Sequence, residues 1–387
     1  MLERRASTTA KLQALREAVR KFVDQQVEPL LGASEQAGAM SSELLDLIKS
    51  HGYNGLRISA EWGGQGLSFA EFCVVLEGFA RLGPSMHFWI IDSLGMTLQR
   101  LGTSQQKDKY LRPYAEWTKK GSLGFTEPDA GSDAAAIRTR AVRDDGGWII
   151  NGRKHFSSRG DQADFVLITA VTDHERGPRG GITTFLVDRG TPGFTIGRVE
   201  LSMGSRLHTL AELNFDDCFV PAEAVLGEVG YGFVAAMKTL DDGRLAVSST
   251  CIGTSQRLIE LMVDHVKQRS TFGAKLADRQ GVRWMIADSV AELELGRALL
   301  YRSMEQLENE EPLGVNASIC KLHCSEMVNR IADRAVQLYG GMGVIRGITV
   351  EQLYRDVRFL RVGEGTSEVQ RMLIARSVLG RPSRDGD

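Results

Sequence analysis

The pattern of apolar and polar residues divides the chain into a helical part, a β-rich part and a second helical part. Up to about residue 120, apolar residues recur at the three- and four-residue spacing of amphipathic or buried helices. This spacing predicts helices over residues 9–30, 41–51, 69–82 and 87–101. We therefore expect an N-terminal α-helical domain over residues 1–120.

Short runs rich in β-branched and aromatic residues follow, separated by turns that contain Gly, Asp, Asn or Pro. The clearest predicted strands are Trp148–Ile150, Phe165–Val171, Ile182–Val187 and Glu212–Phe215. This pattern predicts a small, β-barrel-like middle domain over residues 121–231.

Helical periodicity then returns and continues to the end of the chain. Long patterns run over residues 233–268, 281–308 and 313–339, and two shorter helical segments follow. They predict a C-terminal domain with a four-helix bundle over residues 232–387. The order of helices, strands and helices assigns the chain to the α+β class.

Composition limits the classes of partner and compartment. Of the 387 residues, 42% are hydrophobic and 25% are charged, and the formal net charge is −2, so no basic field suggests a nucleic-acid partner. No apolar run approaches the roughly 18 residues of a membrane span, so none is expected. The five cysteines lack a disulfide spacing, which fits a reducing compartment, and we expect a cytoplasmic protein.

Two features could be mistaken for special sites. Cys320, His323 and Cys324 could suggest a metal site, but no second ligand pair lies nearby in sequence. Buried cysteines on a helix are the favoured interpretation, so no metal is expected. The basic N-terminus also has a regular amphipathic face and two glutamates, and we interpret it as the first helix of the fold.

The stretch 337–371 contains the strongest candidate for chemistry. A glycine-rich segment ends a predicted helix there, and Glu364 lies between Gly363 and Gly365. A glutamate between glycines is usually a solvated loop residue. A carboxylate held beside apolar surface instead has a raised pKa and can act as a general base near neutral pH. These residues alone leave both possibilities open.

Two segments resemble the signatures of the acyl-CoA dehydrogenase family. The first is the order GGMG, LYRDVR and EGTSEVQR within residues 340–371, and the second is GFTEPDAGSD at residues 124–133. The resemblance covers nearly the whole chain and matches the family's α–β–α order of domains. It implies an FAD-dependent α,β-dehydrogenation of an acyl-CoA thioester, in which Glu364 removes the α-proton of the substrate.

The same resemblance implies the roles of further residues. Those implied to contact FAD are Phe125, Thr126, Gly131, Ser132, Phe156, Ser158, Arg269, Thr271, Phe272, Gln280, Gln337, Gly340, Gly341, Thr366 and Glu368. Those implied to contact the acyl-CoA are Ser132, Asp241, Arg244 and Gly365. In the family, the residues around 269–280 and 337–341 reach the cofactor across a subunit interface. The expected assembly is therefore a homotetramer, a dimer of dimers, with an electron-transfer flavoprotein as the electron acceptor.

Two strand positions and two glycines make these expectations more specific. Phe156 and Ser158 are two residues apart, so a regular strand would place both on one face. The isovaleryl branch of the family carries its base one residue before the Arg that Arg244 resembles, whereas this chain has Gly243 there. Gly363 stands where many straight-chain relatives have Tyr. A wider acyl pocket is expected, with tolerance of branched, cyclic or otherwise bulky acyl groups.

Several alternatives stay open at the level of sequence. The protein could be an acyl-CoA oxidase, or a dehydrogenase of an acyl group bound to a carrier protein. It could also be a non-catalytic assembly or binding protein that retains the fold. The segment Asp241–Arg244 could be a solvated start of a helix as well as a substrate contact.

Overall fold

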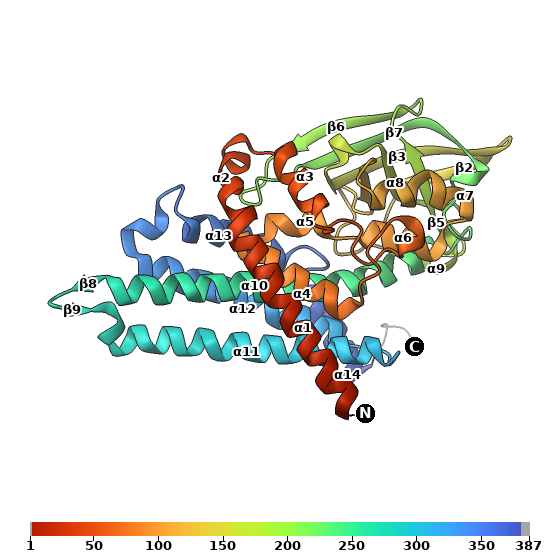
Figure 1. The fold of residues 1–387 in the computed structure, drawn as a ribbon. Helices are drawn as coiled ribbons and strands as arrows, with labels where there is room; N and C mark the ends of the chain where they lie inside the picture. Colours follow the sequence, from red (N-terminus) through yellow and green to blue (C-terminus); the bar gives the residue numbers. More distant parts are fainter. Residues whose placement is uncertain (1, 381–387) are drawn as a thin grey trace.

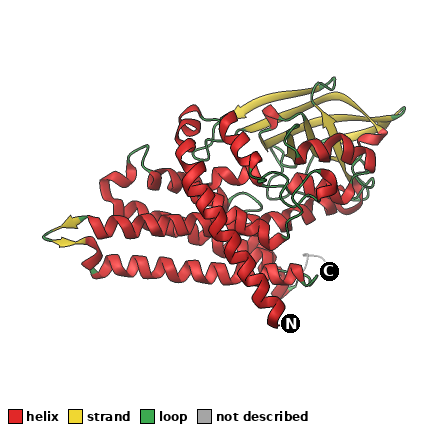
Figure 2. Cartoon of the chain, viewed as in Figure 1, coloured by secondary structure: helices red, strands yellow, loops and turns green. Residues whose placement is uncertain are grey.

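A computed structural model describes residues 2–380 and has a helical, a β-sheet and a second helical part along the chain (Figures 1 and 2). The predicted helix 9–30 is two helices, α1 (Leu2–Phe22) and α2 (Glu28–Ala37), joined by a π turn at Val23–Val27. The other helices of this part are α3 (Ser42–Ser50), α4 (Phe69–Phe79), α5 (His87–Ile90), α6 (Ser93–Leu101), α7 (Ser104–Gln106) and α8 (Arg112–Ala115).

Helix α4 shows how local sequence determines where these helices begin. Ser68 Oγ accepts a hydrogen bond from the backbone N–H of Glu71 at 3.2 Å, and Glu71 Oε2 accepts one from the N–H of Ser68 at 2.8 Å. This reciprocal arrangement satisfies two N–H groups that would otherwise lack partners at the helix start.

The middle part is a seven-stranded sheet. Its strands are β1 (Gly121–Gly124), β2 (Arg140–Asp144), β3 (Gly147–Ser158), β4 (Phe165–Val171), β5 (Ile182–Asp188), β6 (Phe194–Glu200) and β7 (Leu210–Pro221). They lie in the order β1-β4-β2-β3-β7-β6, and β5 pairs with β4. The short helix α9 (Pro178–Gly181) precedes β5.

Alternate residues of β4 belong to two different hydrophobic cores. Val166 and Ile168 pack in a core made within the middle part, whereas Phe165 and Leu167 pack with Leu94 and other residues of the N-terminal helices. Because successive side chains of a strand point to opposite faces, β4 joins the sheet to the helices beneath it.

The C-terminal part contains three long helices and two shorter ones. They are α10 (Gly232–Gln268), α11 (Gln280–Glu308), α12 (Asn316–Tyr339), α13 (Thr349–Val357) and α14 (Ser367–Leu379). A small hairpin of β8 (Ser270–Thr271) and β9 (Ala274–Lys275) joins α10 to α11. Figure 1 places this hairpin at the end of the long helices that lies away from the sheet. Cys320 and Cys324 are buried in α12, as expected.

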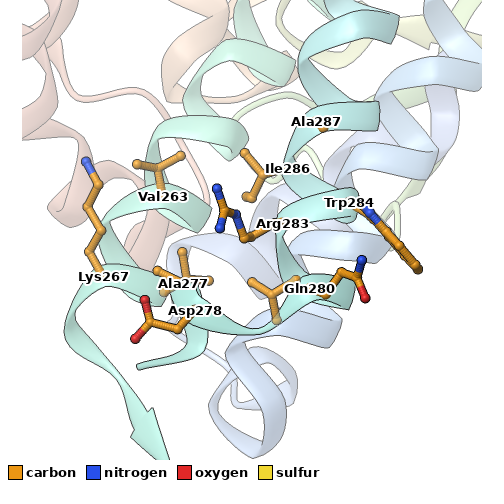
Figure 3. A pocket seen from close by; sticks show the side chains of 11 residues that line it. Val263, Lys267, Ala277, Asp278, Gln280, Arg283, Trp284, Ile286 and Ala287 are labelled. Carbon is orange, nitrogen blue, oxygen red and sulfur yellow. The ribbon is translucent and has the colours of Figure 1, made fainter. Parts of the chain in front are cut away.

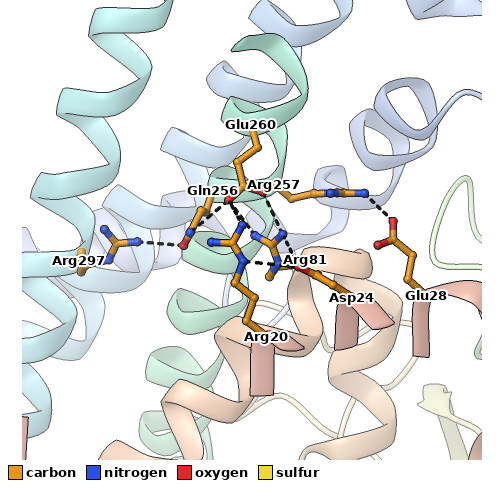
Figure 4. Close-up of polar contacts among 8 residues, drawn as sticks. All are labelled: Arg20, Asp24, Glu28, Arg81, Gln256, Arg257, Glu260 and Arg297. Atoms are coloured by element: carbon orange, nitrogen blue, oxygen red, sulfur yellow. Dashed lines mark hydrogen bonds and ion pairs between the residues drawn. The ribbon is translucent and has the colours of Figure 1, made fainter. Parts of the chain in front are cut away.

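An ion-pair network fixes the first helices to α10 (Figure 4). Arg81 is only 4% exposed and pairs with Glu260 at 2.9 Å and with Asp24 at 3.3 Å. Arg257 pairs with Glu28 at 2.5 Å. A buried guanidinium without partners would be strongly destabilising, so these ion pairs hold the π turn and α2 in place against α10.

Within residues 2–380, no helix is both long and apolar enough to span a bilayer. The same residues contain no cluster of three or more His, Cys, Asp or Glu side chains arranged to hold a metal ion.

Candidate active site

Glu364 lies in the turn between a short 3-10 helix, Arg358–Arg361, and helix α14. Its φ is +55°, and the φ of Gly365 is +86°, so two consecutive residues adopt left-handed backbone conformations. Thr366 then caps α14, since its Oγ1 accepts a hydrogen bond from the N–H of Val369 at 3.3 Å. The catalytic candidate therefore stands at the N-terminal end of a helix, on a strained turn.

The Glu364 carboxylate is unusual in its surroundings. Oε2 is buried and has no hydrogen-bond partner among the described residues. Burial raises the pKa of Glu364 from its ordinary value to about 7, although the charges of Arg244 and Lys321 oppose the rise. Glu364 is thus no ordinary solvated loop residue. A carboxyl group with such a pKa exchanges a proton readily near neutral pH.

The segment Asp241–Arg244 lies inside the 37-residue helix α10, so it is not a solvated helix start. Arg244 is 11% exposed, and its Nη1 donates to Asp241 Oδ1 at 2.5 Å. Burial raises the pKa of Asp241, and Arg244 and Asp242 modify it further. Asp242 instead pairs with Arg57 of the N-terminal part at 3.1 Å. Within this segment, Gly243 and Arg244 are the residues near the Glu364 carboxylate.

The segment that follows β1 is held against the sheet by a buried ion pair. Lys154 of β3 is fully buried, and its Nζ donates to Glu127 Oε1 at 2.6 Å. Glu127 also accepts the backbone N–H groups of Arg138 at 2.6 Å and Thr139 at 3.1 Å. Burial alone would raise the pKa of Glu127, but Lys154 and these donors lower it overall. Glu127 and Lys154 had not been singled out from the sequence as a pair.

Two of the four residues of this segment that were implied to contact FAD are open to solvent, and the other two, Phe125 and Thr126, are half-buried. Gly131 and Ser132 are exposed, and a β-carbon at Gly131 would meet no atom within 4 Å. The backbone carbonyl of Thr126 accepts a hydrogen bond from the N–H of His155 at 2.8 Å, which joins Phe125 and Thr126 to β3. An exposed glycine and hydroxyl beside an anchored strand suit close approach by a phosphate or a carbonyl oxygen.

A β-bulge shapes the next pair of residues. The register of β3 against β7 shifts between Lys154 and Ser157, and Phe156 has φ of +58°. Phe156 is 53% exposed and stacks on His155, with ring centroids 3.9 Å apart. Ser157 is buried and Ser158 is half-buried. Because the bulge interrupts the regular alternation of faces, the expectation from a regular strand that Phe156 and Ser158 share one face does not carry over to this segment. The exposed aromatic ring of Phe156 suits packing against a flat ring system such as a flavin.

A second group of the implied FAD contacts lies far from this sheet within the chain. Phe272 is 98% exposed at the tip of the β8–β9 hairpin, with φ of +48°. His265 near the end of α10 stacks on Tyr339 at 4.1 Å, which brings the end of α12 beside the hairpin. The members of this second group are Arg269, Thr271, Phe272, Gln280, Gln337, Gly340 and Gly341. One chain therefore does not bring them to Phe156.

A groove of about 760 Å³ lies between α10 and α11 next to the hairpin (Figure 3). Gln280, Trp284 and Lys267 are among the residues that line it. Phe272, Gly340 and Gly341 are also exposed, and an exposed aromatic ring next to a groove suits contact with another molecule.

Aromatic rings lie near Gly363, the residue that precedes Glu364. A β-carbon at Gly363 would lie 3.6 Å from the ring of Phe359. Phe359 contacts Phe88 with centroids 5.2 Å apart, and Phe88 stacks on His208 at 3.8 Å. Gly363 thus removes one possible ring, but Phe359 occupies the adjoining space. Glu368 is 82% exposed on the first turn of α14.

Comparison with known families agrees with this arrangement. Family models for the N-terminal, middle and C-terminal domains of acyl-CoA dehydrogenases match residues 9–118, 122–218 and 230–379. The chain belongs to the acyl-CoA dehydrogenase family. It has the family's three-domain architecture and is an oxidoreductase that acts on CH–CH bonds.

Two named proteins are similar in sequence to this chain over almost their full length. A short-chain-specific acyl-CoA dehydrogenase of Clostridium acetobutylicum is 34% identical over 96% of this chain and 98% of the relative. CarC, a subunit of the caffeyl-CoA reductase–Etf complex of Acetobacterium woodii, is 37% identical over 94% of this chain and 97% of the relative.

A solved structure supports the fold and others support the cofactor. Butyryl-CoA dehydrogenase of Megasphaera elsdenii has a TM-score of 0.89 at 34% identity, covering 95% of this chain and 98% of the other. Structures with FAD bound are also similar to this chain, and the family is FAD-dependent. The exposed Phe156, Gly131 and Ser132 are compatible with that cofactor.

Proposed function

We propose that this acyl-CoA dehydrogenase oxidises the Cα–Cβ bond of an acyl-CoA thioester to a 2-enoyl-CoA, with Glu364 as the catalytic base. The observation that carries the proposal is the buried, unpartnered Oε2 of Glu364 together with a pKa of about 7. A general base is most effective when its pKa lies near the working pH.

The chemistry divides between this carboxylate and the cofactor. The thioester carbonyl acidifies the α-carbon, and Glu364 takes the α-proton on a carboxylate oxygen. FAD, when bound, would supply the acceptor for the two electrons and the hydrogen of the β C–H bond, so that a Cα=Cβ double bond would remain. Filling of the acyl pocket excludes water around Glu364, which strengthens the electrostatic interactions of the carboxylate.

The residues around Glu364 suit the thioester and CoA portion of an acyl-CoA. Asp241, Arg244, Gly365 and the hydroxyl of Ser132 are assigned to contacts with the thioester and the CoA portion. Arg244 suits this role because its guanidinium is held rigidly by Asp241 at 2.5 Å and can bind phosphate or carbonyl oxygens.

The shape of the acyl pocket depends on two neighbouring residues. Gly363 leaves room for branched, cyclic or otherwise bulky acyl groups next to the base, while the ring of Phe359 lies 3.6 Å from a β-carbon at that position. We propose that the space between Gly363 and the ring of Phe359 determines the preference for such groups. Gly363→Tyr should then shift the preference towards straight chains, and Phe359→Ala should extend it to larger groups.

The assembly follows from the separation of the two FAD-contacting groups. Phe125, Thr126, Phe156 and Ser158 of one subunit would complete their site with Arg269, Phe272 and Gln280 of a neighbour. This arrangement supports a homotetramer built as a dimer of dimers. We assign an electron-transfer flavoprotein as the acceptor of electrons, since CarC is named as part of a complex with such a protein.

The experiment that tests the function is an anaerobic titration. The purified protein is mixed with straight, branched and cyclic acyl-CoAs, and the flavin absorbance near the ~450 nm region is recorded. Bleaching by at least one thioester, abolished in Glu364→Gln with flavin still bound, is the expected result. Bleaching that persists in Glu364→Gln would overturn the role of the base. Rapid peroxide formation in air would indicate an oxidase.

A further inference from the structure

Lys321 of α12 is a buried cation beneath the turn that carries Glu364. It is 0% exposed, and its Nζ donates a hydrogen bond to the backbone carbonyl of Gly365 at 2.7 Å. Among residues 2–380 it forms no ion pair in the structure. Burial of an ammonium without a paired carboxylate is strongly unfavourable. A methionine would fill the same volume without that cost, so the charge at this place needs a reason.

The turn above Lys321 needs support because it is strained. Glu364 has φ of +55°, a left-handed conformation that is unfavourable for an L-residue. Such a conformation persists only where the surroundings determine it. Gln370, which is fully buried, donates from Nε2 to the carbonyls of Glu364 and Gly365, both at 3.0 Å. Together with Lys321, this makes three hydrogen bonds to two successive carbonyls.

We propose that Lys321 is a positioning residue for the catalytic base: its ammonium fixes the Gly365 carbonyl, and thereby the direction of the Glu364 carboxylate, and it supplies positive charge beneath that carboxylate. The inference rests on the proposed function of Glu364. It adds to that function a residue that acts on the base through the backbone of the turn and through its charge.

The charged groups around the turn determine the direction of the electrostatic effect. Glu364 is influenced by Arg244 of α10 and by Lys321 of α12, and both lower its pKa against the effect of burial. Burial lowers the pKa of Lys321 to about 8, while Cys251, Glu364 and Glu326 raise it and Arg244 lowers it. The Lys321 ammonium and the Glu364 carboxylate therefore each favour the charged form of the other. Removal of the ammonium should raise the pKa of the base further.

The test compares Lys321→Met, Lys321→Arg and a control, Ser325→Ala. Ser325 is buried one turn further along α12, and its hydroxyl bonds only to the carbonyl of Leu322 among the described residues. For each variant, kcat and KM are measured against pH with the acyl-CoA that reduces the wild type fastest. Acetoacetyl-CoA is the second probe, because removal of its acidic α-proton gives an enolate whose charge-transfer band with oxidised flavin needs no hydride transfer.

We expect Lys321→Met to keep its flavin and to lose about 10- to 100-fold in kcat, with KM changed much less. The acidic limb of its kcat profile should move upward by about half a unit to one unit, and the acetoacetyl-CoA band should need a higher pH. Lys321→Arg retains the charge, so its pH midpoint should stay near that of the wild type while kcat falls. Ser325→Ala should match the wild type.

Three results would overturn the inference. The first is a Lys321→Met enzyme with the kcat, pH profile and charge-transfer band of the wild type. The second is the loss of helical circular dichroism and flavin in both Lys321 variants, which would make the residue structural only. The third is an equal fall in kcat with no change in any pH midpoint for Met and Arg. A wild type that neither oxidises an acyl-CoA nor deprotonates acetoacetyl-CoA would instead refute the proposed function itself.

Discussion

The carboxylate of Glu364 lies directly against the α-carbon of Gly243: a β-carbon at residue 243 would be 2.6 Å from Glu364 Oε2. No side chain fits there without displacing the carboxylate, since real β-carbons essentially never approach another heavy atom so closely. The same geometry explains how the position before Arg244 can hold the base in the isovaleryl branch of the family. Two positions 121 residues apart face one point in space.

Gly243→Ala should therefore reduce kcat by roughly tenfold or more, because the added methyl group moves the carboxylate away from the α-proton. Flavin content and the circular dichroism spectrum should not change, and the measurement is steady-state kinetics with the best acyl-CoA. Gly32→Ala in α2 is the matched control, since its new β-carbon would meet no atom within 4 Å. Equal kcat values for Gly243→Ala and the wild type would contradict the geometry.

Glu364→Gln should change the pH dependence of stability. Burial raises the pKa of Glu364 from 4.5 to about 7, so the folded state binds this proton more tightly than the unfolded state. The resulting stabilisation is complete below the unfolded pKa and is lost as pH rises through the folded pKa. The difference in Tm between Glu364→Gln and the wild type should thus grow in favour of the variant from pH 5 to pH 8. Parallel Tm curves over this range would refute the raised pKa.

Lys154→Met should destabilise the protein and weaken FAD binding. The change leaves Glu127 buried without its cation, which costs about 3–5 kcal/mol in comparable cases. Urea unfolding and fluorescence titration with FAD measure the two effects. A Glu127→Gln/Lys154→Met double variant should recover part of the stability, because neither buried charge then remains.

A surface ion pair provides the control for Lys154→Met. Arg176 pairs with Asp173 at 3.4 Å while 74% exposed, so Arg176→Met should change the free energy of unfolding by less than about 1 kcal/mol. An equal loss of stability in Arg176→Met and Lys154→Met would show that the buried pair has no special role.

Two variants can test whether FAD is held between subunits. Phe156→Ala alters the group of implied FAD contacts on the sheet, and Phe272→Ala alters the group on the exposed hairpin. Each variant alone should bind FAD weakly. The two variants are then denatured and refolded together. Because each site would take its sheet residues from one subunit and its hairpin from another, about one quarter of the sites should have an intact Phe156 and an intact Phe272 and should recover flavin. Full flavin content in Phe272→Ala alone would exclude a contribution from the hairpin.

The order of elements could be predicted from the sequence wherever the periodicity was strong. Strand β4 was predicted with the bounds that the structure has, because its apolar run is buried on both faces. Strands β1, β2 and β6 were missed, since they are short or largely exposed and carry little apolar alternation. The π turn within the first predicted helix was missed too, because it leaves the spacing of Val19, Val23 and Val27 almost unchanged.

The site was only partly accessible to sequence reasoning. Glu364 was identified through a contiguous motif, and its raised pKa was anticipated as one of two possibilities. Lys321 supports that motif from 44 residues away, and no spacing rule connects them. Phe359 likewise lies beside Gly363 only because of the 3-10 turn between them. The wider acyl pocket was predicted from Gly363 alone. Its shape would also depend on Phe359, a residue that the sequence analysis did not single out.

Because of the exposed hairpin, we expect the fraction of sites that retain FAD to depend on the protein concentration. Phe272 is 98% exposed in a single chain, although an aromatic ring in water gains nothing for the folding of that chain. On the proposed assembly, each site gains its second wall only on association. Dissociation of the subunits and release of FAD are then coupled equilibria, so that dilution promotes both. The yellow colour of the protein would report its subunit concentration, and excess FAD should hold the oligomer together.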